Sequence, residues 1–284
     1  MNRNVRLVLA LVLSLGLLAG CGGASKAPVQ EEQGGQPSQQ QEQVTLKVGA
    51  TVTPHSEILE SIKDEAAAEG INLEIVVFTD YVQPNIALAE GDLDANYFQH
   101  LPYLNNFNKE RGLDLVSVGA VHLEPLGLYS IKVNSLSELP DGATVSIPDD
   151  PTNAGRALKL LADQGLITLK EGVGVEATPK DVVENPRNLN LQMLQAEYLP
   201  RSLQDVDAAV INTNYYLDAE KNLGVKATVL ARESAEDNPY ANVVAVRKGD
   251  EDRPEIQKLM TLLRSDAVAK FINEKYGGAV IPAF

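Results

Sequence analysis

The sequence has no tryptophan, a single cysteine and few aromatic residues, and each shortage limits what the protein can be. Aromatic residues make up only 5% of the chain. Because Cys21 has no second cysteine to pair with, the chain cannot form an internal disulfide or a cysteine-based metal site. The folded part must therefore be stabilised by a large hydrophobic core.

The common catalytic and cofactor-binding motifs are also missing. GVGVEA at 172–177 has two glycines, but it lacks the third glycine and the following Lys-Ser/Thr of a phosphate-binding loop. The chain has neither a G-x-S-x-G nor an H-E-x-x-H segment. We therefore expect a protein that is not an enzyme, with no catalytic residue and no cofactor.

The three histidines are widely spaced. His55, His100 and His122 share no short spacing of the kind that places two ligands on one metal ion. Scattered histidines are more often hydrogen-bonded structural residues, so we predict no metal site.

The longest apolar run lies near the N-terminus. Arg3 and Arg6 precede Leu7 to Ala19, a run too short to span a bilayer comfortably, which is typical of an export signal. Leu18-Ala19-Gly20-Cys21 resembles the bacterial lipobox, in which the cysteine becomes the new N-terminus and carries lipid. The alternative is a plain signal peptide with a chance cysteine. We predict a lipoprotein signal peptide over 1–20 and a membrane anchor on the outer, extracytoplasmic face through Cys21.

Lipidated Cys21 would begin a flexible tether over 21–43. Residues 22–43 are rich in Gln, Gly, Pro and Ser, a composition that cannot bury enough apolar surface to order itself. Removing 1–20, which holds two arginines and no acidic residue, would change the formal net charge from −15 to −17. This strongly negative net charge argues against nucleic acid or an anionic lipid surface as a partner of the folded part.

From Val44 onward, short apolar runs alternate with helical patterns, which predicts an α/β protein with mainly parallel sheets. We expect strands at 44–52, 71–79, 113–121, 126–133, 143–148, 191–197, 207–212, 226–231 and 242–248. We expect helices at 53–70, 83–91, 153–167, 178–185 and 253–278.

One predicted helix carries an anion-binding pattern. Thr152 and Asn153 occupy its expected N-cap, and Arg156 would lie in the first turn, where a basic side chain opposes the helix dipole. Free N–H groups and a guanidinium together can bind a carboxylate. The alternative pairs Arg156 with Asp149 or Asp150, and the pattern alone does not choose between them.

Two further features are compatible with a binding site. Asn212 and Asn214 follow an apolar strand, and Asn242 precedes another. An asparagine side chain offers both a hydrogen-bond donor and an acceptor, as a binding site needs, but asparagine is also a common turn residue. Six of the fourteen aromatic residues (5 Phe and 9 Tyr) fall between positions 78 and 107. They are either ordinary core or the wall of a pocket.

Several segments resemble the methionine-binding lipoproteins of bacterial ABC importers, the NLPA lipoprotein family, and occur in the family's order. They are FTDYVQPNIALAEGDLDANYFQHLPYL (78–104), IPDDPTNAGRALKLLADQGLITLKEGVG (147–174), DVVENPRNL (181–189), LPRSL (199–203), AVINTNY (209–215) and NPYANVVAVR (238–247). The lipobox and GGAV (277–280) agree.

The resemblance implies a two-lobed periplasmic-binding-protein-like fold with two crossover strands, near 126–132 and 240–246, and a mixed, mostly parallel sheet in each lobe. The first lobe would be 44–128 with 243–284, and the second 129–242. The implied function is capture of L-methionine by lobe closure and delivery to an ABC permease with its ATPase. The alternatives are D-methionine, methionine sulfoxide, a methionine dipeptide or, from another class, a metal-capturing lipoprotein or an adhesin.

The resemblance also implies a set of binding residues. Arg156 would bind the ligand's carboxylate, and Asn212 and Asn242 would make its other polar contacts. The thioether would lie among aromatic side chains, against which sulfur gains about 0.3–1.5 kcal/mol; these are Tyr81, Phe98, His100 and Tyr103.

Other residues of these segments receive different expectations. His100 would be a neutral residue that shapes the pocket. Tyr97 and Phe107 are assigned to the core, and Asn85 and Asn153 to structural positions at a turn and a cap. AVHLEP (120–125) departs from the family pattern with His122 and Glu124. If Glu124 lines the pocket, it could favour a different amino-group geometry or a dipeptide.

Overall fold

The computed structural model describes residues 43–284, which form two main β-sheets covered by helices. The predicted signal peptide, Cys21 and the tether up to residue 42 lie outside the described residues. No helix in the described part is both long and apolar enough to cross a membrane.

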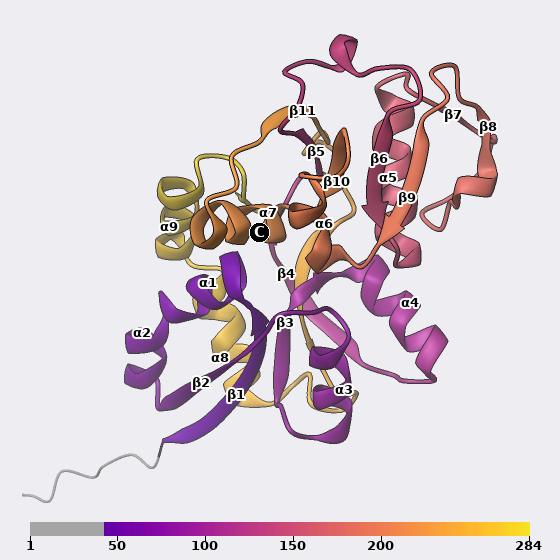
Figure 1. The fold of residues 1–284 in the computed structure, drawn as a ribbon. Helices are drawn as coiled ribbons and strands as arrows, with labels where there is room; N and C mark the ends of the chain where they lie inside the picture. Colours follow the sequence, from indigo (N-terminus) through magenta and orange to yellow (C-terminus); the bar gives the residue numbers. More distant parts are fainter. Residues whose placement is uncertain (1–42) are drawn as a thin grey trace, which may run out of the picture. The chain divides into compact units, whose positions relative to one another are not determined.

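The first sheet has the strand order β13-β4-β12-β3-β1-β2 and lies in the lower half of Figure 1. Its strands are β1 (Val44–Thr51), β2 (Ile71–Phe78), β3 (Ala95–His100), β4 (Val116–Leu123), β12 (Ala241–Val246) and β13 (Ile281–Pro282). The second sheet, above it, has the order β11-β5-β10-β6-β9. Its strands are β5 (Gly127–Ser130), β6 (Thr144–Pro148), β9 (Asn190–Leu194), β10 (Ala208–Ile211) and β11 (Thr228–Arg232).

The chain passes between the two sheets twice within the described part. It leaves the first sheet after β4, at residues 124–126, and returns after β11, at residues 233–240. We call these two segments the first and second connectors. Each adjoins one of the segments expected to cross between the lobes.

The sheets are mixed, but the expectation that they are mostly parallel is wrong. β1 pairs in parallel with β2 and β3, whereas β12 pairs antiparallel with both β3 and β4. In the second sheet, β6 forms two parallel pairs and β5 two antiparallel pairs. The second connector delivers β12 at the end of the sheet where β3 and β4 finish, so β12 must run opposite to them.

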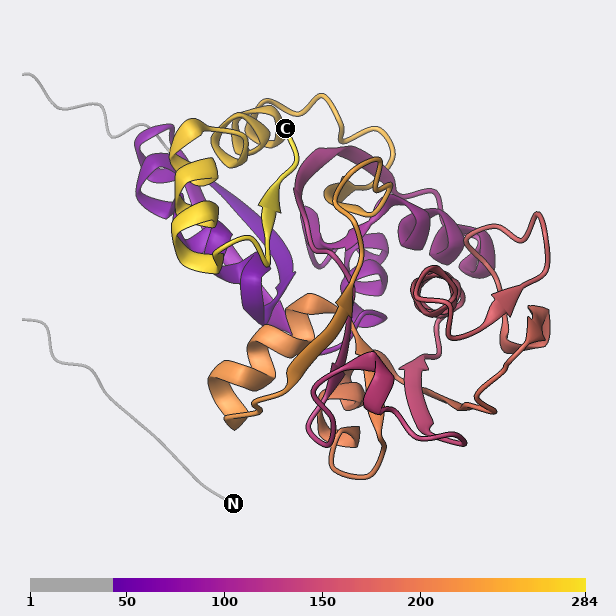
Figure 2. The same cartoon turned by 90° about the horizontal axis from the view of Figure 1, so that it is seen from above.

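Nine α-helices cover the described sheets. They are α1 (Glu57–Glu60), α2 (Lys63–Ala68), α3 (Gln83–Glu90), α4 (Leu101–Arg111), α5 (Pro151–Asp163), α6 (Leu199–Ser202), α7 (Thr213–Leu223), α8 (Pro254–Leu263) and α9 (Asp266–Tyr276). Figure 2 shows the yellow α8 and α9 on one side and, on the opposite side, the hairpin of β7 (Thr168–Leu169) and β8 (Val182–Glu184).

Three predicted helices are divided or absent in the structure. The helix expected at 178–185 is a single 3₁₀ turn, Pro179–Asp181, followed by β8, whose β-branched valines favour a strand pairing with β7. The region 53–70 is divided into a π-helical turn (Val52–Ser56), α1 and α2. The region 253–278 is divided into α8 and α9, because the Ser265 side chain caps a new helix by accepting from the Val268 N–H.

Each sheet has its own hydrophobic core. Leu46, Val48 and Ile58 belong to the core of the first sheet, and Val145 and Leu158 to that of the second. Tyr97 is fully buried in the first core, as predicted, and Phe107 is buried beside Phe98 and Tyr103. Several buried polar residues lie at strand ends or in the first connector, among them His100, Asn242 and Glu124.

Candidate ligand-binding pocket

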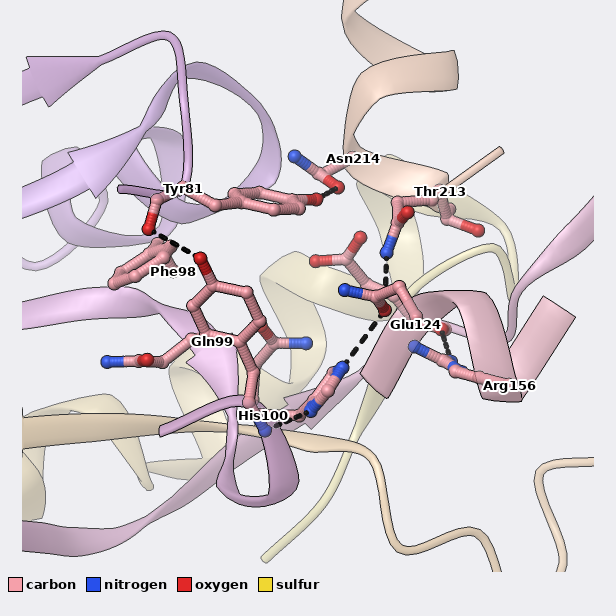
Figure 3. A pocket seen from close by; sticks show the side chains of 12 residues that line it. Tyr81, Phe98, Gln99, His100, Glu124, Arg156, Thr213 and Asn214 are labelled. Carbon is pink, nitrogen blue, oxygen red and sulfur yellow. Dashed lines mark hydrogen bonds between the residues drawn. The ribbon is translucent and has the colours of Figure 1, made fainter. Parts of the chain in front are cut away.

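A pocket lies where the two sheets face each other, and the space in and around it that no atom fills is about 340 Å³, open solvent at its mouth included. All seven predicted binding residues line it: Tyr81, Phe98, His100, Tyr103, Arg156, Asn212 and Asn242. Five further residues line it as well: Gln99, Glu124, Asn153, Thr213 and Asn214. Figure 3 shows these twelve side chains converging on one space.

The fold brings these residues together from strand and helix ends. Phe98 to His100 end β3, and Tyr103 follows in the first turn of α4. From the second sheet, Arg156 lies on α5, while Asn212 to Asn214 begin α7. Glu124 comes from the first connector, and Asn242 is paired in register with His100 across β12 and β3. The pocket therefore uses both sheets and a connector.

Aromatic side chains form one wall of the cavity. The Tyr81 ring centroid lies 5.9 Å from those of both Phe98 and Tyr103, and the Tyr103 hydroxyl donates to the Tyr81 carbonyl at 3.0 Å. The Tyr81 hydroxyl reaches across to Asn214 Oδ1 at 2.5 Å, a bond visible in Figure 3. Phe107 stacks behind Tyr103 and does not line the cavity. This wall can receive an apolar, polarizable side chain.

His100 is held in one neutral form by its two ring nitrogens. Nδ1 accepts from the Tyr103 backbone N–H at 3.1 Å, so Nε2 carries the proton and donates to Asn153 Oδ1 at 3.1 Å. Burial, reinforced by the nearby positive charge of Arg156, lowers the pKa of His100 to about 3. The ring therefore fixes the shape of the pocket without adding charge.

Helix α5 begins earlier than expected, so the predicted cap is wrong. Asp150 is the N-cap, and its carboxylate accepts from the Asn153 N–H at 2.9 Å. Pro151 takes the first helical position, which suits a residue without an N–H group. Burial raises the pKa of Asp150. Arg156 consequently lies in the second turn.

The expected alternative partners of Arg156, Asp149 and Asp150, do not bind it. Its Nε donates to both carboxylate oxygens of Glu233, at 2.8 and 3.0 Å, and its Nη2 donates to Glu233 Oε2 at 2.6 Å. Nη2 also donates to the Glu124 carbonyl at 2.7 Å. The Tyr240 ring lies 4.3 Å from the guanidinium carbon. Arg156 is thus firmly placed at the pocket wall.

Asn212 presents an unpaired acceptor to the pocket. Its Nδ2 donates to Asn153 Oδ1 at 3.0 Å, which fixes the amide, while its buried Oδ1 has no hydrogen-bond partner among the described residues. A buried carbonyl without a partner costs about 1–3 kcal/mol. The position therefore suits a donor that arrives with a ligand.

Glu124, which lines the pocket, also belongs to a buried cluster with His55 and His122. The His122 Nε2 lies 2.7 Å from Glu124 Oε1, and the His55 Nε2 lies 3.4 Å from the same oxygen. His55 Nδ1 contacts the Thr51 hydroxyl at 2.7 Å, and its Nε2 contacts Asn242 Oδ1 at 3.0 Å. Burial raises the pKa of Glu124, against the opposing effects of His55, the Asn214 backbone amide and Arg156.

The same cluster contains the ligand types of a metal site. The available ligand atoms of His55, His122 and Glu124 all lie within 4.8 Å of one another. As placed, however, the ring nitrogens and the carboxylate are hydrogen-bonded to each other and to their neighbours. A metal ion would have to displace protons from this bonded network.

The pocket can therefore bind a small zwitterion with an apolar side chain. Glu124 and the Asn212 oxygen accept hydrogen bonds, Arg156 donates them, and the aromatic wall provides apolar surface. Sequence reasoning did not assign Glu124 to the site, although its place after a predicted strand was a usable signal. It missed Glu233 entirely, because no local pattern connects Glu233 to Arg156.

The comparisons with known proteins identify the family. The family model for the NlpA lipoprotein matches residues 46–284. The chain is 41% identical to the methionine-binding lipoprotein MetQ of Bacillus subtilis, over 96% of each chain. A nutrient binding protein from Burkholderia cenocepacia bound to methionine is 46% identical, with a TM-score of 0.80 over 84% of this chain and 100% of that one.

A further solved structure relates the fold to transport. The ABC transporter, periplasmic substrate-binding protein from Coxiella burnetii is 42% identical, with a TM-score of 0.78 over 84% of this chain and all (100%) of that one. The fold class implied by the resemblance, a periplasmic-binding-protein-like α/β fold, is thereby confirmed. The chain belongs to the NlpA lipoprotein family.

Proposed function

We propose that the protein captures L-methionine outside the membrane and delivers it to an ABC permease and its ATPase. Relatives named for methionine binding and for ABC transport support this assignment. The observation that carries it is the pocket itself, in which buried acceptors, a fixed guanidinium and an aromatic wall converge. The protein is a binding protein and not an enzyme.

In this proposal each end of the ligand has its own partners. Arg156 binds the carboxylate, and Glu124 with the Asn212 oxygen accepts from the ammonium. Asn242, whose Oδ1 contacts His55, contributes a further polar contact. The thioether lies against Tyr81, Phe98, His100 and Tyr103, where its sulfur meets ring edges. No charged residue lies among these four side chains, since His100 is neutral.

Capture would occur by closure of two lobes, 44–128 with 243–284 and 129–242. Three contacts already join the two lobes: Tyr81 with Asn214 at the pocket, the Tyr215 hydroxyl with the Thr79 carbonyl at 3.2 Å, and Lys221 with Glu57 at 2.6 Å. A ligand that bridges both lobes stabilises this closed arrangement, which the permease then recognises. Lipidated Cys21 would hold the protein at the outer face of the cell membrane.

The test is thermal unfolding of protein that has been unfolded and refolded to remove carried ligand. A ligand at a free concentration 1,000 times its dissociation constant adds about 4.1 kcal/mol to the free energy of unfolding. For a protein this size, that raises the melting temperature by roughly 8–16 °C. We expect that rise with L-methionine. The same measurement is made with D-methionine, methionine sulfoxide, methionine dipeptides and Zn²⁺. A rise in melting temperature with one of these and none with L-methionine would overturn the assignment of L-methionine as the ligand.

The same measurement tests the role of Arg156. We expect Arg156→Ala to lose most of the rise because the ligand's carboxylate loses its charged partner. Arg201→Ala, which removes an exposed arginine on α6, is the matched control and should keep the full rise. An undiminished rise in Arg156→Ala would refute the assigned contact.

A further inference from the structure

Glu233, in the second connector, binds the guanidinium that faces the pocket, yet it does not line the cavity itself. We propose that Glu233 is a positioning residue that holds Arg156 in the orientation needed for a ligand's carboxylate. The inference rests on the proposed function, because it assigns Glu233 a part in amino-acid recognition.

The hydrogen bonds of Arg156 leave one nitrogen for a ligand. Nε and one side of Nη2 are occupied by the Glu233 carboxylate, and Nη2 also donates to the Glu124 carbonyl. Within residues 43–284, Nη1 donates to no protein acceptor. A guanidinium is planar and rigid, so fixing two of its nitrogens also fixes the direction of the third.

Glu233 is itself held from several directions. Its Oε2 accepts from the Leu126 N–H at 2.9 Å and from Asn238 Nδ2 at 3.3 Å. Its own backbone N–H donates to the Leu126 carbonyl at 2.9 Å. These bonds join the first connector, the second connector and Arg156. The carboxylate is therefore a fixed support, with only 12% of its side chain exposed.

The burial of Arg156 explains why such a support is needed. Its side chain is only 3% exposed, and an isolated buried guanidinium would be strongly unfavourable. Glu233 compensates the charge before any ligand arrives, while the Tyr240 ring lies against the guanidinium. The donor is thus oriented in advance, which lowers the ordering cost of binding.

Glu233 also has an opposing effect, because its negative charge repels the ligand's carboxylate. We expect positioning to outweigh repulsion. In Glu233→Gln the amide keeps one acceptor but turns an NH₂ group toward the N–H donors of Arg156, so the guanidinium must rotate or lose a bond. The predicted net result is weaker binding of a carboxylate ligand.

The experiment measures the affinity of the full-length protein for L-methionine and for L-methioninol, in which a CH₂OH group replaces the carboxylate. We expect Glu233→Gln to weaken L-methionine binding by about 10-fold or more, the size of a hydrogen bond to a charged group. Methioninol binding should change by less than about 2-fold, on the same scale of affinities. Glu233→Asp, which restores the charge on a shorter side chain, should recover part of the loss. Glu236→Gln, an exposed position in the same connector, is the control.

Each outcome has a distinct meaning. Equal losses for both ligands would assign Glu233 a purely structural role and overturn the proposal, as would unchanged or tighter L-methionine binding. If Glu233→Gln folds poorly, Glu233→Asp is measured instead: it should weaken L-methionine binding more than methioninol binding, and equal losses for the two ligands, or no loss for L-methionine, would refute the proposal. Failure of the wild-type protein to bind L-methionine would instead overturn the proposed function.

Discussion

At the residue scale, the pocket holds two acceptors that are buried at a cost. Glu124 is 5% exposed, and burial raises its pKa, while the Asn212 oxygen has no partner in the described part of the chain. A ligand's ammonium would satisfy both and would favour the ionised form of Glu124. In the proposed function, these two groups would drive recognition of a free amine.

We predict that Glu124→Gln weakens L-methionine binding about 10- to 100-fold, because a neutral amide replaces a charged acceptor. The loss should largely disappear for 4-(methylthio)butanoate, which has the carboxylate and the thioether but no amine. Isothermal titration calorimetry of both ligands checks this, with the exposed Glu236→Gln as control. A similar loss for both ligands would show that Glu124 supports the pocket and does not recognise the amine.

Some site residues could be predicted from the sequence and others could not, for a physical reason. The resemblance pointed to the residues that the pocket brings together, including Arg156 and the aromatic wall. It could not supply the partner of Arg156, since Glu233 lies 77 positions away and no periodicity relates the two. Pairing with the adjacent aspartates was the obvious local choice, but Asp150 is used as the cap of α5.

At the scale of elements, α5 carries Arg156 and packs closely on the segment before the 3₁₀ turn at 179–181. A Cβ atom on Gly155 would lie 2.1 Å from the Val175 carbonyl oxygen, which is backbone and cannot move aside easily. Glycine is normally unfavourable within a helix by about 1 kcal/mol relative to alanine. Close packing therefore outweighs helix propensity at this position.

We predict that Gly155→Ala destabilises the protein by about 1–3 kcal/mol in spite of its better helix propensity, because the added methyl group overpacks the contact. Gly174→Ala is the matched control, since a Cβ there would have nothing within 4 Å and should leave stability nearly unchanged. Urea unfolding of the two variants makes the comparison. A Gly155→Ala variant as stable as the wild type would contradict the close packing of α5 against Val175.

Elements were predicted well where one pattern dominated and poorly where caps decided the outcome. Strands with a clear apolar or alternating pattern, such as β1, β6 and β10, occur within the expected ranges. Helix boundaries depended on single side chains, as with Asp150 at α5 and Ser265 at α9. Strand direction was also beyond local patterns, because β12 takes its direction from a connector that crosses between sheets.

At the scale of the whole molecule, three buried neutral histidines make stability depend on pH. Burial is the main cause that lowers the pKa of His55 to about 4, and those of His100 and His122 to about 3. The ordinary pKa of 6.5 applies once the chain unfolds. Between these values the unfolded chain binds protons that the folded protein excludes, so stability is complete above about pH 6.5 and falls as the pH decreases.

We predict that the urea midpoint falls between pH 7 and pH 5. Each histidine contributes at most about 1.4 kcal/mol per pH unit. Glu124 and Asp150 oppose the trend, because their pKa values are raised by burial and the folded protein takes up their protons first. His100→Gln should show a shallower decline than the wild type. A midpoint that does not change over this pH range would contradict the neutral, buried state of the three rings.

The central place of β12 in the first sheet has a consequence for how the protein is made. β12 joins β4 to β3, yet it is one of the last strands to leave the ribosome. Until residues 241–246 emerge, the early strands form two incomplete fragments, whereas all five strands of the second sheet are already available. Synthesis therefore favours completing the later-encoded sheet before the earlier one, and the half of the pocket formed by β3 and β12 becomes stable only near the end of translation.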